Sequence, residues 1–383
     1  GRKKRKNYQT CNFYETMKIG IDARMYGPAQ GGIGRYIEQL IKQLQKIDQN
    51  NQYILFLRKS NFDECEITNS NFKKVLADIP WYSLKEQTDF CKIIKKENID
   101  LMHFPHWNVP LFYRGKFVVT IHDLIMYHFP RTEASTHGPI VYWLKDKLHR
   151  LILSSAAKRA QAVIATSEFT KNDIVKELKI NPEKITVTYQ APFSQTTSIE
   201  SLPTEVKKPY ALYVGAGYPH KNLPALLCAW KKIEGINSEL NLVLAGRKNF
   251  FYDQLTNSVE FKNCQRIQYV SNPTDPQLET LYQNADLFVF PSLYEGFGLP
   301  PLEAMLRNIP VVSSNTSCLQ EILGNAVWYF DPTDTEDMAR KILMTFDNTD
   351  LRDTLQKSGV ELLKKYSWEK LTYETLHTYQ KSG

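Results

Sequence analysis

The chain has 383 residues with a formal net charge of +7, and 42% of its residues are hydrophobic. This length exceeds one ordinary hydrophobic core, so we expect two globular domains, and no apolar run reaches the roughly 18 residues that a membrane-spanning helix needs. Basic residues at 2–6 supply five of the positive charges, and the remaining body is nearly neutral, which argues against a nucleic-acid-binding surface.

Residues 1–16 precede the first predicted strand and are interpreted as a basic leader, either an added segment or a disordered extension. No apolar segment follows the basic run, so it is not a secretory signal. The six cysteines are scattered and form no C-x-x-C pair, which is typical of reduced cytosolic proteins and indicates neither a disulfide framework nor a zinc site. We therefore expect a cytoplasmic protein.

Strands and helices alternate along the first half of the chain, a pattern that predicts a parallel sheet with helical crossovers. The predicted strands are 17–23, 53–57, 99–103, 117–121, 162–165 and 185–189. The predicted helices are 33–47, 81–96, 138–160 and 168–178. Residues 60–74 are polar and Asn-rich, so this stretch is predicted to be a loop.

A glycine turn, Gly31-Gly32-Ile33-Gly34, lies between the first strand and its helix. Glycines at the start of a helix let the backbone approach a phosphate or a sugar closely. The third glycine of a dinucleotide-binding fingerprint is missing, because Ile37 stands there, so a nicotinamide enzyme is disfavoured. The alternative is a tight strand-to-helix connection that binds nothing.

Histidines follow two of the predicted strands. His103 and His106 lie at the end of one strand, and His122 and Asp123 lie at the end of the next. Ligands of open α/β sheets collect at the carboxyl ends of the strands, so these four side chains are predicted to lie together near a bound substrate. For His122 the alternative is that its side chain anchors a loop through hydrogen bonds.

The predicted helix 138–160 has two faces. The first is apolar, and we expect it to be buried. Its residues are at positions 140, 144, 148, 151 and 152. Trp143, Lys147 and Arg150 share the other face, where aromatic and basic groups together suit a phosphorylated acceptor or a membrane surface, although a solvated helix shows the same pattern. Ser167 is well suited to cap the next helix.

A stretch rich in Ser, Thr and Pro, 190–208, separates two series of strands. The second series has predicted strands at 210–214, 242–244, 267–270, 287–290 and 311–313. This repeated alternation predicts two doubly wound domains. The expected divisions are an N-terminal domain at 17–195, a linker at 196–208, a C-terminal domain at 209–364 and a final helix at 365–383.

Two motifs of the second half carry chemistry. V-G-A-G-Y-P-H-K-N at 214–222 places Lys221 after a glycine turn, where its point charge can meet a diphosphate. F-V-F-P-S-L-Y-E-G-F-G-L-P-P-L-E-A-M at 288–305 runs from a strand through a glycine turn into a helix whose N-terminus favours an anion. Glu295 and Glu303 add two carboxylates that can accept hydrogen bonds from hydroxyl groups. A polyol phosphorylated at one end would use both features.

The pattern E-G-F-G-L-P-x-L-E-A-M, after the strand A-D-L-F-V-F-P-S, resembles the glutamate-pair motif of retaining glycosyltransferases of family 4. The resemblance implies the GT-B fold, an α/β architecture in which two Rossmann-like doubly wound domains face a central cleft and a C-terminal helix crosses back to the first domain. The N-terminal domain is then expected to bind the acceptor, and the C-terminal domain the nucleotide sugar.

The same resemblance implies roles for individual residues. Glu295 lies at the donor sugar, Glu303 holds the ribose hydroxyls, and His122 contacts the donor sugar or orients an acceptor hydroxyl. We therefore expect Glu295, His122 and Lys221 to be catalytic. The wider donor-binding set is Gly32, Gly34, Ala216, His220, Arg247, Val270, Gly296, Phe297, Gly298 and Leu299. Acceptor-side candidates are His103, His106, Asp123, Trp143, Lys147, Ser167 and Lys171.

One position departs from the family pattern. The family usually carries an arginine five residues before the lysine, but Ala216 stands there, so the leaving group has one cation fewer. His220, Arg247 and Lys248 are the candidates to compensate.

The expected reaction is retaining transfer of a hexose from a nucleotide sugar to a glycan or lipid-linked acceptor in polysaccharide assembly. Mannose from GDP-mannose is the first choice, followed by UDP-glucose, UDP-N-acetylglucosamine or a rhamnosyl donor. No cofactor or metal is expected, because the spacing of D-P-T-D at 331–334 does not fit an Asp-x-Asp metal motif. Any membrane contact is expected to be peripheral, at the inner face.

Two other functions fit parts of the pattern. The first is a nucleotide-sugar-binding protein without catalysis, because Ala216 weakens the stabilisation of the leaving group. The second is a glycoside hydrolase, which needs Glu295 and Glu303 to flank one glycosidic bond. A loop and the following helical turn would instead place the two acids along one wall.

Overall fold

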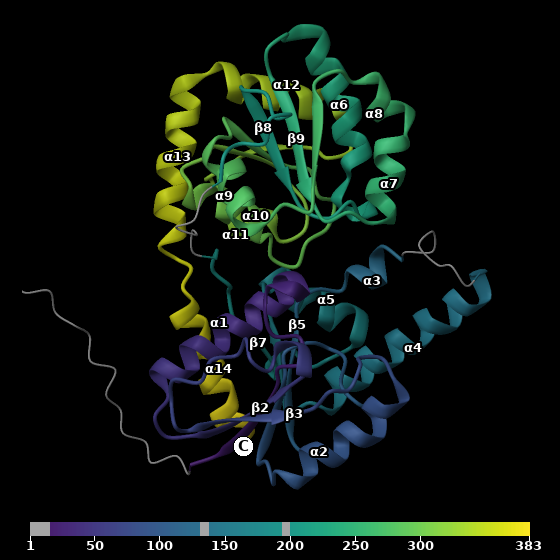
Figure 1. Ribbon diagram of the computed structural model, residues 1–383, viewed down its shortest axis with the longest axis vertical. Helices are drawn as coiled ribbons and strands as arrows, with labels where there is room; N and C mark the ends of the chain where they lie inside the picture. The colour runs from purple at the N-terminus through teal and green to yellow at the C-terminus, as the bar shows by residue number, and fades with distance from the viewer. Residues whose placement is uncertain (1–15, 131–137, 194–199) are drawn as a thin grey trace, which may run out of the picture.

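The protein consists of two α/β domains, one above the other in Figure 1, in a computed structural model that describes residues 16–130, 138–193 and 200–383. The N-terminal sheet has seven parallel strands in the order β3-β2-β1-β4-β5-β6-β7. These are β1 (Lys18–Asp22), β2 (Gln52–Leu57), β3 (Phe72–Leu76), β4 (Leu101–Phe104), β5 (Phe117–Ile121), β6 (Ala162–Ala165) and β7 (Ile185–Val187).

The C-terminal sheet has six parallel strands in the order β10-β9-β8-β11-β12-β13. These are β8 (Tyr210–Val214), β9 (Asn241–Gly246), β10 (Ile267–Ser271), β11 (Leu287–Phe290), β12 (Val311–Ser314) and β13 (Trp328–Phe330). The order reverses between β8 and β11, and in such a sheet the ends of the strands at this switch point are the usual place for a ligand.

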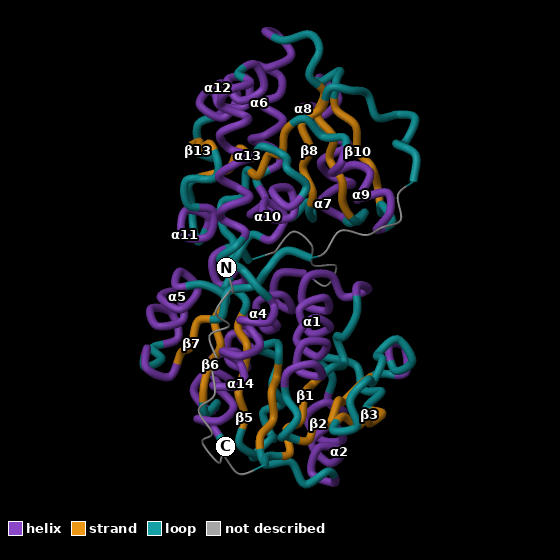
Figure 2. The backbone as a smooth tube through the Cα atoms, turned by 90° about the vertical axis from the view of Figure 1, so that its left-hand side faces the viewer, coloured by secondary structure: helices purple, strands orange, loops and turns teal. Residues whose placement is uncertain are grey.

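Helices lie on both faces of each sheet (Figure 2). Those of the N-terminal domain are α1 (Gly31–Ile47), α2 (Cys91–Lys96), α3 (Ile125–His128), α4 (Gly138–Arg159) and α5 (Glu168–Leu178). Those of the C-terminal domain are α6 (Leu223–Ile236), α7 (Phe250–Asn257), α8 (Val259–Asn263), α9 (Asp275–Gln283), α10 (Leu299–Leu306), α11 (Leu319–Leu323), α12 (Thr335–Asp347) and α13 (Thr349–Leu363). Two apolar clusters fill the two faces of the first sheet.

The last helix, α14 (Trp368–Ser382), crosses back and packs on the N-terminal domain, as the GT-B expectation required (Figure 1). Trp368, Leu371 and Tyr379 are buried in the same apolar cluster as β1 and α1. The Trp368 ring stacks on Phe193 with the ring centroids 5.5 Å apart. The core of the first domain is therefore completed by the end of the chain.

Local structure differs from the sequence expectations in three places. The predicted loop 60–74 ends in β3, and β13 was not predicted. The predicted helix 81–96 is a π-helical turn, Glu86–Phe90, followed by α2. Both missed strands are edge strands of their sheets. In β3 the apolar pattern is interrupted by Lys73 and Lys74, and β13 has only three residues.

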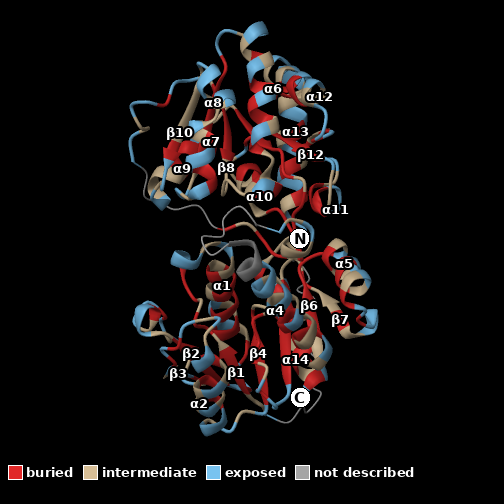
Figure 3. Cartoon of the chain, turned by 90° about the vertical axis from the view of Figure 1, so that its right-hand side faces the viewer, coloured by how far each residue is buried: buried red, intermediate tan, exposed pale blue. Residues whose placement is uncertain are grey.

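Helix α4 corrects the prediction of a buried apolar face. Ile152 is buried as expected, but Leu144, Leu148 and Leu151 are 55%, 49% and 58% exposed. The helix extends sideways from the first domain (Figure 1). Its leucines are therefore exposed, whereas the central strands of both sheets are buried (Figure 3). Among the described residues, no helix is both long and apolar enough to cross a membrane.

Candidate active site

Lys221 and Glu295 form an ion pair at the switch point of the C-terminal sheet. Lys221 ends a short 3-10 helix after β8, and Glu295 lies in the loop after β11, the strand paired with β8. The Lys221 Nζ and Glu295 Oε1 atoms are 2.5 Å apart, with side chains only 15% and 9% exposed. Ser317 fixes the loop by accepting the Glu295 backbone N–H at 3.0 Å. The structure thus brings together a cation and a carboxylate that the sequence placed 74 residues apart.

Helix α10 begins directly after this loop. Gly298 precedes it with φ of 90°, a left-handed conformation that favours glycine, and makes no side-chain cap among the described residues. Because Pro300 and Pro301 carry no N–H, the start of α10 offers an anion the backbone N–H of Leu299 and the positive end of the helix dipole. Leu299, the first residue of α10, packs against the apolar clusters of both domains, so this helix end lies at the domain boundary.

Glu303 lies one turn into α10, where its carboxylate accepts a hydrogen bond from the Tyr282 hydroxyl at 3.1 Å. Burial raises the Glu303 pKa above its ordinary value, and this is opposed by Arg307, by the Tyr282 hydroxyl and by Arg35 of the N-terminal domain. Arg35 itself reaches across the boundary to Asp275, with Nη2 and Oδ1 2.5 Å apart. The sequence did not identify Arg35 as a site residue, because a lone arginine after a glycine turn belongs to no recognisable motif.

Position 216 offers no cation, as the sequence indicated, and the proposed substitutes are engaged elsewhere. Arg247 donates to the backbone carbonyls of Ala29 and Pro28 at 2.9 and 3.2 Å, so it joins the second domain to the short 3-10 helix just before the glycine turn of the first. Lys248 Nζ lies 3.6 Å from an Asp253 carboxylate oxygen. Lys221 is therefore the predicted donor-side cation that lies directly at Glu295.

The remaining donor-side candidates divide into open and packed positions. A Cβ at Gly32 would meet open space among the described residues, whereas one at Gly34 would lie 2.0 Å from the Gly27 carbonyl oxygen, so Gly34 is needed for the turn itself. Val270 and Phe297 are buried in the apolar cluster of the second domain. His220 is also buried, stacked against Tyr218 with the ring centroids 5.9 Å apart.

His103 corrects the expectation of an acceptor-side histidine. Its side chain is fully buried, with Nδ1 2.7 Å from the Tyr379 hydroxyl of α14 and Nε2 2.8 Å from Thr120 Oγ1. Burial lowers its pKa to about 3, so the ring is neutral at physiological pH. Because both ring nitrogens are used, His103 ties α14 to the sheet.

His122 and His106 lie nearer the domain boundary. His122 donates from Nε2 to the Pro105 carbonyl at 2.9 Å, and its ring meets Tyr36 edge to face at 4.8 Å. Burial lowers the pKa of His122 to about 4 and that of His106 to about 3. His106 packs its ring against Trp107 and accepts the Asn108 N–H at 3.4 Å. Both histidines are neutral, so any contact they make with a substrate is through an uncharged ring.

The other acceptor-side candidates do not form one group. Asp123 accepts the Ile125 N–H at 2.9 Å. Trp143 is 57% exposed on α4, with the Lys147 ammonium 5.6 Å from its ring centroid. Ser167 is buried, caps α5 as predicted, and donates to the Gly296 carbonyl at 2.7 Å. Lys171 is half-buried on α5. Ser167 thus contacts the Glu295 loop rather than open acceptor space.

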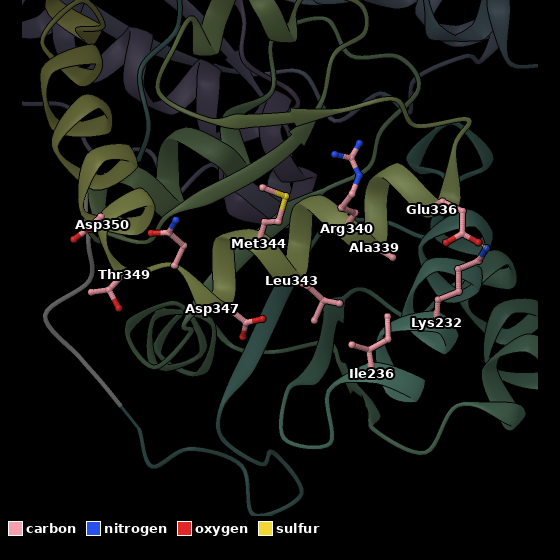
Figure 4. Close-up of a pocket in the computed structure, with 11 residues that line it drawn as sticks. Lys232, Ile236, Glu336, Ala339, Arg340, Leu343, Met344, Asp347, Thr349 and Asp350 are labelled. Carbon is pink, nitrogen blue, oxygen red and sulfur yellow. Dashed lines mark hydrogen bonds and ion pairs between the residues drawn. The ribbon is translucent and has the colours of Figure 1, made fainter.

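A separate hollow of about 630 Å³ lies on the second domain between α6, α12 and the start of α13, and contains none of the predicted site residues (Figure 4). Lys232 and Glu336 pair at one end of it. Among the described residues, His128, Asp173 and Glu177 have ligand atoms close enough to share a metal. Asp173 already accepts hydrogen bonds from His128 and from Tyr294, so we interpret that group as part of the domain contact.

Solved structures share this arrangement over nearly the whole chain. Sucrose-phosphate synthase from Thermosynechococcus elongatus superposes with a TM-score of 0.73 at 19% identity, covering 95% of this chain and 98% of that one. HepE of Anabaena, solved in complex with UDP and glucose, superposes with a TM-score of 0.71 at 17% identity, covering 95% and 99%. Two facing parallel α/β sheets with a returning C-terminal helix define the GT-B class of glycosyltransferases.

Family models match both domains. Residues 30–191 match the model described as Glycosyltransferase Family 4, and residues 194–361 match the one described as Glycosyl transferases group 1. The chain therefore belongs to glycosyltransferase family 4. Curated relatives include O-antigen chain mannosyltransferase B of Escherichia coli, 29% identical over 91% of this chain and 96% of the relative. Another is O-antigen chain mannosyltransferase RfbU of Salmonella typhimurium, 27% identical over 70% and 71%.

Proposed function

We propose that this glycosyltransferase moves mannose from GDP-mannose, with retention of configuration, to a hydroxyl of a growing or lipid-linked glycan. The single observation that carries the proposal is the ion pair of Lys221 and Glu295 at the switch point, next to the N-terminus of α10. The choice of mannose is supported by the two O-antigen mannosyltransferases to which the chain is similar.

The proposed chemistry follows from where charge develops. The bond between the anomeric carbon and the diphosphate breaks, and the acceptor oxygen bonds to that carbon on the same face. The acceptor proton passes to the departing phosphate. Lys221, the Leu299 N–H and the positive end of the α10 dipole stabilise the diphosphate, and preorganised charges of this kind are commonly the largest catalytic contribution. The Glu295 carboxylate favours the positively charged sugar ring and accepts hydrogen bonds from its hydroxyls.

Glu303 is proposed to accept the ribose hydroxyls of the nucleotide. Its carboxylate lies beside Tyr282 and within the electrostatic reach of Arg35, so nucleotide binding would involve both domains. Neither carboxylate needs a metal in this scheme, and we propose transfer without one.

A donor screen tests the proposal. GDP-mannose, UDP-glucose and UDP-N-acetylglucosamine are each added to the protein, and the melting temperature and nucleoside diphosphate release are measured with and without a lipid-linked glycan acceptor. UDP-glucose is included because HepE was solved with UDP and glucose. The proposal expects GDP release and a mannosylated acceptor. Binding without release would support the inactive binding protein, and free mannose without a transfer product would support the hydrolase.

The exposed side of α4 supports peripheral contact with the inner face of a membrane. Leu144, Leu148 and Leu151 are exposed at helical spacing, beside the exposed Lys145 and Lys147. Apolar groups can enter the headgroup region while lysines meet anionic lipid. Flotation with vesicles containing phosphatidylglycerol should capture the protein, and vesicles of phosphatidylcholine alone should capture less.

A matched pair of variants tests the α4 contact. Leu148→Ser should reduce capture by the anionic vesicles, whereas Ile236→Ser, which changes an even more exposed apolar residue on the second domain, should not. Equal capture of both variants would contradict the contact.

A further inference from the structure

Helix α5 of the N-terminal domain contacts both residues that flank Glu295. Before Glu295, the Tyr294 hydroxyl donates to an Asp173 carboxylate oxygen at 2.5 Å. The Tyr294 ring packs edge to face on Phe169, with the centroids 5.3 Å apart. The Asp173 carboxylate is itself fixed by His128 Nε2 at 2.8 and 3.0 Å. A residue of the first domain thus holds a side chain next to the proposed catalytic carboxylate.

After Glu295, the Gly296 carbonyl is held by hydroxyl groups of the same helix. Ser167 Oγ lies 2.7 Å and Thr170 Oγ1 3.2 Å from the Gly296 oxygen. Thr166 Oγ1 is 3.1 Å from it, but its single proton has a shorter acceptor in the His122 carbonyl at 2.7 Å. A carbonyl oxygen has two lone pairs, so Ser167 and Thr170 satisfy it completely.

These contacts come from one face of α5. Ser167, Thr170 and Asp173 are spaced by three residues, which places them on the same side of the helix. All three are buried. At the helix start, the Glu321 carboxylate of the second domain accepts the backbone N–H groups of Glu168 and Phe169 at 2.7 and 2.9 Å. The N-terminal half of α5 therefore packs against the C-terminal domain.

The approach at Gly296 leaves no room for a side chain. A Cβ at this position would lie 2.0 Å from the His122 carbonyl oxygen, which belongs to the first domain. Such an overlap with backbone cannot be relieved by a rotamer change, so only glycine permits the observed closeness of the two domains. The glycine after Glu295 therefore serves the domain contact directly.

We infer that Ser167, Thr170 and Asp173 are positioning residues that set the Glu295 loop in its reactive geometry only when the two domains are together. The second domain alone fixes the Glu295 N–H through Ser317, and it supports the loop through the Leu293 N–H and the His220 carbonyl at 2.8 Å. The Tyr294 side chain and the Gly296 carbonyl are instead held by the first domain. This inference rests on the proposed role of Glu295 at the donor sugar.

The test uses variants that each remove one hydroxyl with little change of shape. Thr170→Val removes the contact to Gly296 from the first domain, and Tyr294→Phe removes the contact to Asp173 from the second. Thr170→Ser keeps the hydroxyl and is the conservative rescue. Tyr210→Phe is the matched control, because the buried Tyr210 hydroxyl donates to the Leu281 carbonyl at 2.7 Å entirely within the second domain.

The measurements are kcat and KM for the donor that the screen selects, the affinity for free nucleoside diphosphate, and the melting temperature. Thr170→Val and Tyr294→Phe should each lower kcat by about 10- to 100-fold, because small displacements of a reacting group have large effects on rate. The donor KM and nucleotide affinity should stay within about twofold, since the proposed nucleotide contacts are retained. Thr170→Ser should restore kcat, and Tyr210→Phe should lower only the melting temperature.

The outcomes separate this inference from the proposed function. If Glu295→Gln leaves transfer intact, the proposed role of Glu295 fails, and the positioning inference fails with it. If Glu295→Gln abolishes transfer while Thr170→Val and Tyr294→Phe keep wild-type kcat, only the positioning inference is overturned. A fall in melting temperature without a fall in kcat also overturns it. Should Thr170→Val not fold, Tyr294→Phe tests the same loop from the other domain.

Discussion

The two domains present strand ends of opposite character at their boundary. The C-terminal domain places the charged groups Lys221 and Glu295 there as a largely buried pair, each a candidate to exchange its partner for a ligand. The N-terminal domain places His103 and His122 at its strand ends, with neutral rings that are hydrogen-bonded to the protein. Similar topology thus supports an electrostatic site on one side and a positioning surface on the other.

The strongest test of this difference is Glu295→Gln. The variant keeps the shape of the side chain but removes the charge that pairs with Lys221 and that we propose to favour the sugar cation. We expect a loss of turnover of about a thousandfold, comparable with the upper range for removing a preorganised charge contact. Chromatographic measurement of the glycosylated product checks this, and a loss below tenfold would move the reactive centre away from the C-terminal side.

Lys221→Met should have the next largest effect. It removes the cation proposed to meet the diphosphate, so we expect about a hundredfold loss of kcat/KM and weaker binding of GDP. Titration of GDP by calorimetry and the rate of GDP release are the measurements. Because Lys221 and Glu295 touch, the double variant should lose less than the product of the two single losses. Multiplicative losses would show that the two groups act separately.

His103→Phe should act on stability and leave catalysis alone. The variant leaves the hydroxyls of Tyr379 and Thr120 without their buried partner, so we expect a loss of about 2–3 kcal/mol of unfolding free energy. Denaturant unfolding measures this loss. Turnover per folded molecule should stay near the wild-type value, and a selective loss of acceptor KM would restore His103 as an acceptor residue.

Acid should weaken the protein through the same histidine. The folded pKa of His103 is about 3, while the unfolded side chain titrates near 6.5, so below pH 6.5 the unfolded state binds the extra proton. The unfolding free energy should therefore fall as the pH falls from about 6.5 towards 4, by up to about 1.4 kcal/mol per pH unit from this group. His103→Phe should reduce that slope by close to one proton, and an unchanged slope would contradict the burial of a neutral ring.

The closeness of Lys221 and Glu295 could be predicted because each lies in a short motif that follows a strand. The motif of Lys221 follows β8 and that of Glu295 follows β11, and these two strands pair. The parallel sheets followed from the alternation of strands and helices. The sequence did not predict the edge strands β3 and β13, and it did not predict that the leucines of α4 are exposed.

The contacts between the two domains could not be predicted from local sequence patterns. Ser167 was identified as a helix cap, which is correct, but its hydroxyl also serves Gly296, 129 residues away. Asp173 and Tyr294 carried no motif, and their pairing depends on how the domains meet. The sequence correctly placed the histidines at the ends of strands. It could not show that His103 is buried under α14, where it hydrogen-bonds to Tyr379.

The return of α14 to the first domain has a consequence for how the protein matures. Trp368, Leu371 and Tyr379 fill the core around β1 and α1, yet all of β8 to β13 must be translated before they leave the ribosome. The N-terminal domain is therefore synthesised first, but part of its apolar core stays uncovered until α14 is made, after the whole C-terminal domain. The C-terminal domain can thus complete its core before the N-terminal domain does.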